Sequence, residues 1–205
     1  MHPRRYHHGD LRAALLERAE QVLREKGPAA LSLRELARDL GVSHAAPSRH
    51  FKEKQALLDA LALAGFERLD TALATADPAP GSEPGSFAAR LGALVRAYVG
   101  FATAHPQLLD LMYAVKHDPQ ATEALTSAAH RGLLRAAELL TDGQRTGEVR
   151  PGPAEQLCLP TLAAVHGFAD LAASGLLPPE EAAAALDDVV AFVLRGCAPD
   201  RTADA

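Results

Sequence analysis

A turn-forming glycine followed by short polar and basic side chains occurs at residues 41–52, GVSHAAPSRHFK. Residues of a helix advance by about 100° each, so Pro47 and Phe51 would share one face and small, hydroxyl and cationic groups would share the other. Such groups donate hydrogen bonds to phosphate oxygens, and a guanidinium can also read a base edge. This outer face consists of Ala45, Ser48, Arg49 and Lys52. The chemistry available here is contact with a nucleic acid.

Pro47 limits where a helix in this segment can begin. Proline has no backbone N–H and is tolerated only in the first turn, where the N–H groups have no partner inside the helix. It also disfavours α geometry at Ala46. We therefore expect a short third helix that begins at residues 44 to 46, ends near Phe51 and turns the proline ring inward.

Two helices must precede this segment and a longer one must follow it. Apolar residues recur at intervals of three and four over 10–26, which predicts the first helix. Ser32 and Glu35 have the spacing of a capping box and begin the second, which Gly41 closes in a left-handed conformation. The longer helix is predicted at 54–76. The residues expected to face inward from the second helix are Leu33, Leu36, Leu40 and then Val42.

Composition favours an all-α fold. The chain has 205 residues, is 48% hydrophobic and has no tryptophan, and runs with the period of a strand are hard to find. A Pro- and Gly-rich mobile loop is expected at 77–86. Further helices are predicted at about 86–104, 106–116, 119–142, 154–175 and 179–196.

Charge divides the chain into a basic front and an acidic remainder. The net charge is −5, but residues 1–54 hold 11 Lys and Arg against 7 Asp and Glu, and residues 55–205 hold 10 against 19. A basic front can contact phosphate, whereas the acidic remainder argues against nonspecific coating of nucleic acid or of an anionic membrane.

Other features narrow the class of protein. Two cysteines, Cys158 and Cys197, fit a reducing, cytoplasmic compartment and are interpreted as packed thiols. No signal peptide is visible at the start. Pro160 and two polar residues interrupt the most apolar stretch, 159–177, which favours a buried helix over a membrane span. No membrane partner is therefore expected.

No catalytic motif is present. The sequence has no phosphate-binding glycine loop, zinc-protease motif or nucleophile elbow, so we expect no enzyme activity, catalytic residue, cofactor or metal site. His7, His8 and Asp10 could hold a metal ion, but a flexible basic arm is the preferred interpretation.

The first 65 residues resemble a known family. The run LSLRELARDLGVSHAAPSRHFKEKQALLDAL, preceded by YHHGDLRAALLERAEQVLREKG, is similar to the N-terminal domain of tetracycline-repressor (TetR-like) bacterial transcription regulators. Two positions depart from the family pattern, since Pro47 replaces a common Leu or Phe and Ser48 replaces a Tyr that contacts phosphate. The residues at the family's motif positions are Gly41, Val42, Ser43, Ser48, His50, Phe51 and Lys54, of which Ser48 is the departure just named. HPQLLDLMYAVKHDP and AAVHGFADL also resemble a subgroup named for a Trp-His-Gly tripeptide, although residues 165–167 lack the Trp.

The resemblance implies a three-helix helix-turn-helix DNA-binding domain at 1–53 and a larger helical effector-binding and dimerisation domain at 54–205, with 54–76 as the connecting helix. It implies a transcriptional repressor that binds a near-palindromic double-stranded DNA operator as a homodimer and is released by a small apolar or amphipathic effector. Base contacts are expected from Arg34, Arg49, His44 and Ala45; phosphate contacts from Ser32, Ser48, Lys52 and Lys54; and backbone or minor-groove contacts from Arg4 and Arg5. The effector candidates are Phe66, Leu94, Tyr98, Phe101, Leu109, Met112, Tyr113 and His166.

Two long C-terminal helices are the predicted dimer interface. Residues 157–173 are apolar nearly all round, so one face can pack within the chain while the other needs a partner. Gly167 would let two backbones approach closely. A second stripe is expected from Leu186, Val189, Val190 and Val193.

Other classes of protein fit the same helices. An all-α protein-interaction module, or a small-ligand-binding protein without specific DNA binding, would show no salt-dependent affinity for DNA. An all-α enzyme would instead need a pocket with two or more perturbed titratable groups.

Overall fold

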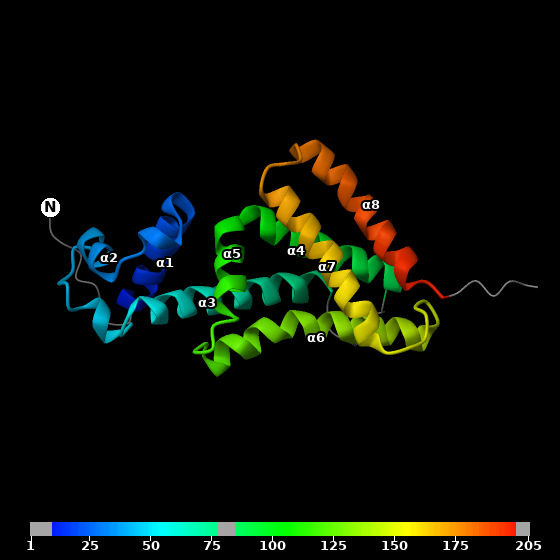
Figure 1. The fold of residues 1–205 in the computed structure, drawn as a ribbon, viewed down its shortest axis with the longest axis horizontal. Helices are drawn as coiled ribbons and strands as arrows, with labels where there is room; N and C mark the ends of the chain where they lie inside the picture. Colours follow the sequence, from blue (N-terminus) through cyan, green and yellow to red (C-terminus); the bar gives the residue numbers. More distant parts are fainter. Residues whose placement is uncertain (1–9, 78–84, 200–205) are drawn as a thin grey trace, which may run out of the picture. The chain divides into compact units, whose positions relative to one another are not determined.

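The computed structural model describes residues 10–77 and 85–199, and every regular element in these ranges is helical, as predicted (Figure 1). The predicted loop at 77–86 falls largely outside the described residues, as do Arg4, Arg5, His7 and His8. The α-helices are α1 (Asp10–Lys26), α2 (Leu33–Asp39), α3 (Lys54–Ala76), α4 (Phe87–Ala104), α5 (Pro106–Val115), α6 (Glu123–Thr146), α7 (Ala154–Ala173) and α8 (Pro179–Cys197). The 3₁₀ helices are η1 (Pro28–Ala30) and η2 (Pro47–Arg49).

The helices form two compact units. One consists of Met1–Phe66 with Gln107–Ser127, and the other of Glu67–Pro106 with Ala128–Ala205, within the described ranges. These two units are defined only by which residues pack together. The division at residues 53 and 54 into a DNA-binding and an effector-binding domain concerns function, and it stays a prediction.

The head of the first unit is formed by α1 and α2 with η1 and η2, which contact one another. Leu15 and Leu23 on α1 and Leu36 on α2 are fully buried between them. On the outside, the Arg18 guanidinium donates to Asp39 Oδ2 over 2.8 Å and so ties α1 to α2. Leu33, Leu40 and Val42, which were expected to face inward, are only half-buried.

Gly41 ends α2 in the way its sequence position predicts. Its φ is +66°, a left-handed conformation that costs a residue with a Cβ free energy. The N–H of Val42 donates to the Ala37 carbonyl over 3.0 Å, and the N–H of Gly41 donates to Arg38 over 3.1 Å. This pair of bonds is a Schellman motif, and it turns the chain toward residues 43–51.

The first unit also contains a close crossing of α3 and α5. A Cβ added at Gly65 would lie 2.5 Å from the Met112 sulfur and 2.9 Å from its Cγ. Met112 is fully buried in this contact. Glycine at position 65 therefore lets α5 lie directly on the α3 backbone.

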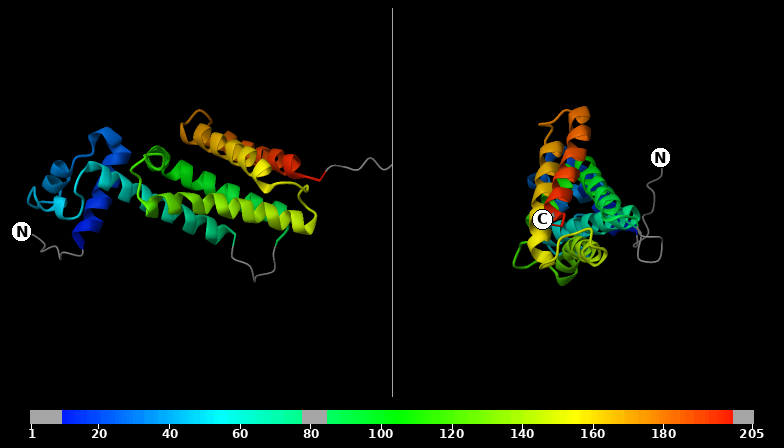
Figure 2. Two further views of the ribbon diagram at one scale, coloured as in Figure 1. Left: turned by 60° about the horizontal axis from the view of Figure 1, so that its bottom comes forward. Right: turned by 90° about the vertical axis from the view of Figure 1, so that its right-hand side faces the viewer.

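The second unit is a bundle in which α4 packs on α7 and α8, and α7 packs on α8 (Figure 2). Its core includes Val95, Phe168 and Val193. Both cysteines are buried here, as interpreted, and burial raises the pKa of the Cys158 and Cys197 thiols. The thiols are thus kept protonated and weakly nucleophilic.

The stripe predicted on the last helix is turned inward to a greater degree than expected. Val190 and Val193 are buried within the unit, and Leu186 and Val189 are half-buried. The large apolar side chains exposed on these helices are instead Leu159 and Leu171 on α7, at 72% and 44%, and Phe192 on α8, at 63%. Phe192 lies between Val190 and Val193 in the sequence. Because each residue of a helix advances by about 100°, its side chain points to the outer surface of α8.

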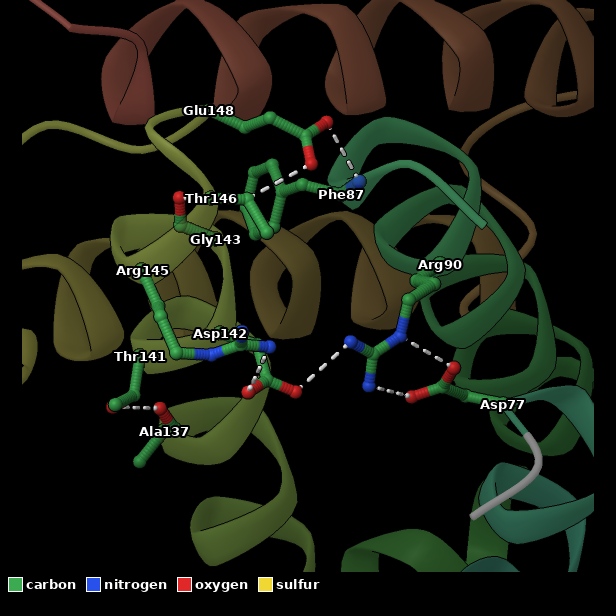
Figure 3. Close-up of polar contacts among 10 residues, drawn as sticks. All are labelled: Asp77, Phe87, Arg90, Ala137, Thr141, Asp142, Gly143, Arg145, Thr146 and Glu148. Atoms are coloured by element: carbon green, nitrogen blue, oxygen red, sulfur yellow. Dashed lines mark hydrogen bonds and ion pairs between the residues drawn. The ribbon is translucent and has the colours of Figure 1, made fainter. Parts of the chain in front are cut away.

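An ion-pair network joins the end of α3 to α4 and α6 in the second unit (Figure 3). The Arg90 guanidinium donates to Asp77 over 2.8 and 2.9 Å and to Asp142 over 3.1 Å. Nearby, Glu148 accepts the N–H of Phe87, the first residue of α4. Gly143 leaves room for the Phe87 ring, because an added Cβ would lie 2.9 Å from it.

Candidate nucleic-acid interface and ligand site

The segment after the Gly41 turn is not the α-helix that we predicted. Residues 47–49 form a single 3₁₀ turn, and Ala46 retains α geometry, with φ −67° and ψ −43°, despite preceding proline. The N–H of Ala46 donates to Ser43 and the N–H of Arg49 donates to Ala46, which are bonds across three residues. Pro47 cannot donate to Ser43, and the first bond across four residues in this segment is the one from the N–H of Phe51 to the Pro47 carbonyl.

The sidedness of this segment is confirmed. Pro47 and Phe51 are buried, and the N–H of Phe51 donates to the Pro47 carbonyl over 2.9 Å. The proline ring thus replaces a larger apolar anchor. The exposed residues are Ala45, Ser48, Arg49 and Lys52, together with His44.

The start of α2 differs from the predicted capping box. Ser32 has the backbone conformation of an N-cap, but within the described residues its side chain makes no capping hydrogen bond. Glu35 pairs instead with Arg38 on the next turn, over 3.3 Å. This exposed ion pair competes for the carboxylate that would have reached back to Ser32. Arg34, the candidate for base recognition, is exposed at the second position of α2.

Lys54, a predicted phosphate contact, also has a structural role. It is the first residue of α3, is exposed, and donates from Nζ to the Ala29 carbonyl over 3.3 Å. An ammonium group has three N–H donors, so this bond leaves capacity for a phosphate. The contact holds the start of α3 against η1.

Arg12 is a basic residue that the sequence reasoning missed. Its guanidinium carbon lies 5.5 Å from the centroid of the Phe51 ring, although the side chain is exposed on α1. A cation–π contact of this kind fixes a positive charge beside the 43–51 segment. No spacing rule links residues 12 and 51, so only the tertiary structure could reveal it.

The eight effector candidates divide equally between the two compact units. In the first unit, the rings of Phe66 and Tyr113 lie 6.2 Å apart, while Leu109 and Met112 are buried. Lys116, which the sequence reasoning did not select, places its ammonium 3.9 Å from the Tyr113 ring centroid. The sequence contains a clue to this contact, because residues three apart on a helix are neighbours and Lys116 follows Tyr113 by three.

In the second unit, Tyr98 on α4 and His166 on α7 share a hydrogen bond of 2.6 Å between Oη and Nδ1. The tautomer of His166 decides which group donates. Both side chains are half-buried, while Leu94 and Phe101 are part of the packed core. A polar pair among apolar helices can orient a ligand that brings its own donor or acceptor.

No helix in the described ranges is both long and apolar enough to cross a membrane.

Comparison with known proteins identifies the family. Residues 15–61 match the family described as "Bacterial regulatory proteins, tetR family", and residues 91–195 match "Tetracyclin repressor-like, C-terminal domain". None of the curated proteins matches the sequence. The Trp-His-Gly resemblance at residues 165–167 is tested by neither family match and stays a prediction.

Solved structures agree with these matches. A protein of unknown function from Rhodococcus sp. RHA1 is 45% identical, with a TM-score of 0.85 over 95% of this chain and 99% of that one. A tetR-family regulatory protein from Rhodococcus RHA1 is 22% identical, with a TM-score of 0.73 over 92% and 98% of the two chains. The TetR-family regulator PfmR from Thermus thermophilus is 20% identical, with a TM-score of 0.70 over 88% and 97%. With both its N-terminal and C-terminal regions matched, this chain belongs to the tetracycline-repressor (TetR) family and is a DNA-binding transcriptional regulator.

Proposed function

We propose that this regulator is a cytoplasmic homodimeric repressor that binds a near-palindromic operator and releases it when a small apolar or amphipathic effector binds. The observation that supports the DNA-binding part most directly is the two-sided segment after Gly41. Pro47 and Phe51 anchor it in the head, and Ser48, Arg49 and Lys52 are exposed on its outer side.

Base recognition is assigned to exposed residues of two adjacent elements. Arg34 on α2 can pair with guanine through two parallel hydrogen bonds, which supplies about 1–3 kcal/mol of discrimination. Arg49, His44 and Ala45 are the next candidates for base edges. Ser32, Ser48, Lys52 and Lys54 are assigned to phosphates, with Arg4 and Arg5 preceding them in an N-terminal arm.

A homodimer through α7 and α8 is supported by exposed apolar surface. Leu159 and Phe192 would each leave a large side chain in water if the chain were a monomer. Gly167 is exposed on α7, and apart from its chain neighbours and the nearby backbone of α7 no described atom lies within 4 Å of the position where its Cβ would be. Two such faces related by a two-fold axis would pair two heads with one palindromic duplex.

The effector candidates form one group in each compact unit. In the second unit, the hydrogen-bonded pair of Tyr98 and His166 would supply polar contacts. In the first unit, Phe66 and Tyr113 would supply aromatic contacts. A ligand changes DNA affinity only through its differential affinity for two states, so a tenfold release needs about 1.4 kcal/mol of coupling.

The test begins with selection of retained fragments from random duplexes, followed by sequencing. Affinity for the selected duplex and for a scrambled one is then measured by fluorescence anisotropy over a range of salt concentrations. We expect a palindromic consensus, tighter binding of the selected duplex, and a preference at one base position that relaxes in Arg34→Ala. Equal affinity for both duplexes at every salt concentration would contradict the proposal.

A further inference from the structure

Lys116 differs from the other lysines of the chain in position. The sequence has four lysines, of which three lie within the first 54 residues and only Lys116 lies beyond them. Its backbone N–H donates to the Met112 carbonyl over 3.2 Å, so it continues the path of α5 by one residue. The other cationic side chains of residues 55–205 are arginines.

The ammonium group lies on an aromatic pair rather than in open solvent. Lys116 Nζ is 3.9 Å from the centroid of the Tyr113 ring, and that ring lies 6.2 Å from the Phe66 ring. Phe66 is buried, while Tyr113 and Lys116 are half-buried. The Tyr113 ring therefore lies between the buried Phe66 ring and the Lys116 ammonium group.

The charge of Lys116 is not neutralised by any described carboxylate, since no ion pair joins it to one in the ranges 10–77 and 85–199. Partial burial lowers the pKa of its amine. Asp118, the nearest acid along the chain, accepts the N–H of Gln120 over 2.8 Å. A partly desolvated cation without a counter-ion is where a bound anion contributes most to affinity.

We propose that Lys116 binds the carboxylate of an amphipathic effector whose hydrocarbon part lies against the half-buried Tyr113 ring. This inference rests on the proposed effector response and gives it a ligand class. One ammonium matches the single charge of a carboxylate, whereas a phosphate dianion would require further donors. The hydrocarbon part is required because the surface next to the amine is aromatic.

The position of Lys116 also connects the ligand to the head. Met112, one turn before Lys116, packs on Gly65 of α3. Gly65 lies eleven residues after Lys54, about 16 Å along the helix axis. Lys116, Gly65 and Lys54 belong to the same compact unit as the 43–51 segment. A ligand that shifts α5 therefore acts on the helix that begins beside the DNA contacts.

The test observes the Lys116 amine directly. Protein grown with lysine labelled with ¹³C at Cε gives signals from only four lysines, and Lys116→Arg assigns the relevant one. The probes are octanoate and octan-1-ol, which share a chain length and differ in charge. We expect octanoate to move the Lys116 signal and raise its titration midpoint, because a carboxylate favours the protonated amine. Octan-1-ol should leave the midpoint unchanged.

A second measurement compares the affinity for octanoate of wild-type protein, Lys116→Met and Lys26→Met by calorimetry. Lys26 is exposed in the last turn of α1 and serves as the matched control. We expect at least a tenfold loss in Lys116→Met and none in Lys26→Met. An unchanged Lys116 midpoint at saturating octanoate, or equal affinity in all three proteins, would overturn the inference. The midpoint is measured on wild-type protein, so the result holds even if Lys116→Met does not fold.

Operator release separates this inference from the proposed function. If octan-1-ol releases the operator from wild-type protein while octanoate leaves Lys116 unaltered, the inference is wrong and the effector response stands. If octanoate raises the Lys116 midpoint but the operator stays bound, the carboxylate site is supported and the effector response is wrong.

Discussion

At the scale of the residue, Lys54 provides a clear test of phosphate contact, because it is exposed and fixed at the start of α3. Lys54→Ala should weaken binding to operator and to scrambled duplex by the same factor. It should also reduce the slope of log affinity against log salt concentration by about 0.9, the release of one counterion. Anisotropy titrations at several salt concentrations measure both. Lys26→Ala is the matched control, and a loss confined to the operator would assign Lys54 to base recognition instead.

Gly41 allows a prediction on stability at the same scale. Gly41→Ala places a Cβ on a residue with φ +66° and should lower the free energy of unfolding by about 1 kcal/mol. Gly100→Ala is the opposite case, since Gly100 is exposed inside α4 and, apart from its chain neighbours and the nearby backbone of α4, no described atom lies within 4 Å of the added Cβ. It should raise stability by up to about 1 kcal/mol. Urea denaturation followed by circular dichroism measures both changes. If both substitutions changed the free energy of unfolding equally, the positive φ at position 41 would not be the cause of a loss of stability.

At the scale of the element, the Arg90 network joins three helices at a site of low exposure. The side chain of Asp77 is 8% exposed and that of Arg90 is 20%. The two carboxylates raise the pKa of Arg90, so the guanidinium stays charged at any working pH. Arg90→Met leaves Asp77 buried without its partner, which should lower the free energy of unfolding by about 3 kcal/mol. Adding Asp77→Asn should cost less than the sum of the single changes, because the two share one interaction.

The control for this prediction is a second ion pair between helices of the same unit. Arg96 on α4 and Asp187 on α8 are 2.6 Å apart, but their side chains are 55% and 69% exposed. Arg96→Met should therefore cost less than about 1 kcal/mol. The measurement is again urea denaturation. A loss at Arg96 as large as the one at Arg90 would mean that burial does not set the value of these pairs.

Helix ends of this chain were predictable where the signal is local. The bounds of α1 and α3 match their predictions. Apolar spacing marks both helices, Gly9 and Gly27 flank α1, and Pro78 follows the end of α3. The segment at Pro47 was predicted incorrectly, because three-residue bonds replaced the α pattern that proline blocks. The predicted capping box is wrong, because the Glu35 carboxylate pairs with Arg38.

Side chains that meet from distant helices could not be predicted in the same way. The hydrogen bond between Tyr98 and His166 joins residues 68 positions apart, and their spacing in the sequence does not predict it. The sequence predicts each of them as a ligand candidate separately and does not predict that they pair. The exposure of Ala45, Ser48 and Arg49 was predictable, because one buried proline fixes which way a short segment faces.

At the scale of the whole molecule, the proposed homodimer predicts how DNA binding depends on α7 and α8. Leu159 and Phe192 are 72% and 63% exposed, so replacing either one should not disturb the fold of the single chain. Leu159→Glu combined with Phe192→Glu would bring like charges from two subunits together in an apolar interface, where desolvation strengthens their repulsion. We expect a folded monomer by light scattering at micromolar concentration, with an unchanged circular dichroism spectrum.

The same double variant should bind the full operator no more tightly than a half-site, because two heads joined on one duplex gain affinity from their linkage. Leu134→Glu is the matched control, since Leu134 is 59% exposed on α6 of the same unit and belongs to neither helix of the proposed interface. It should leave both the dimer and operator affinity intact. A double variant that stays dimeric would move the interface away from α7 and α8. A wild-type monomer that binds one half-site tightly would remove the dimer from the mechanism, because a single head would then account for the whole of the affinity.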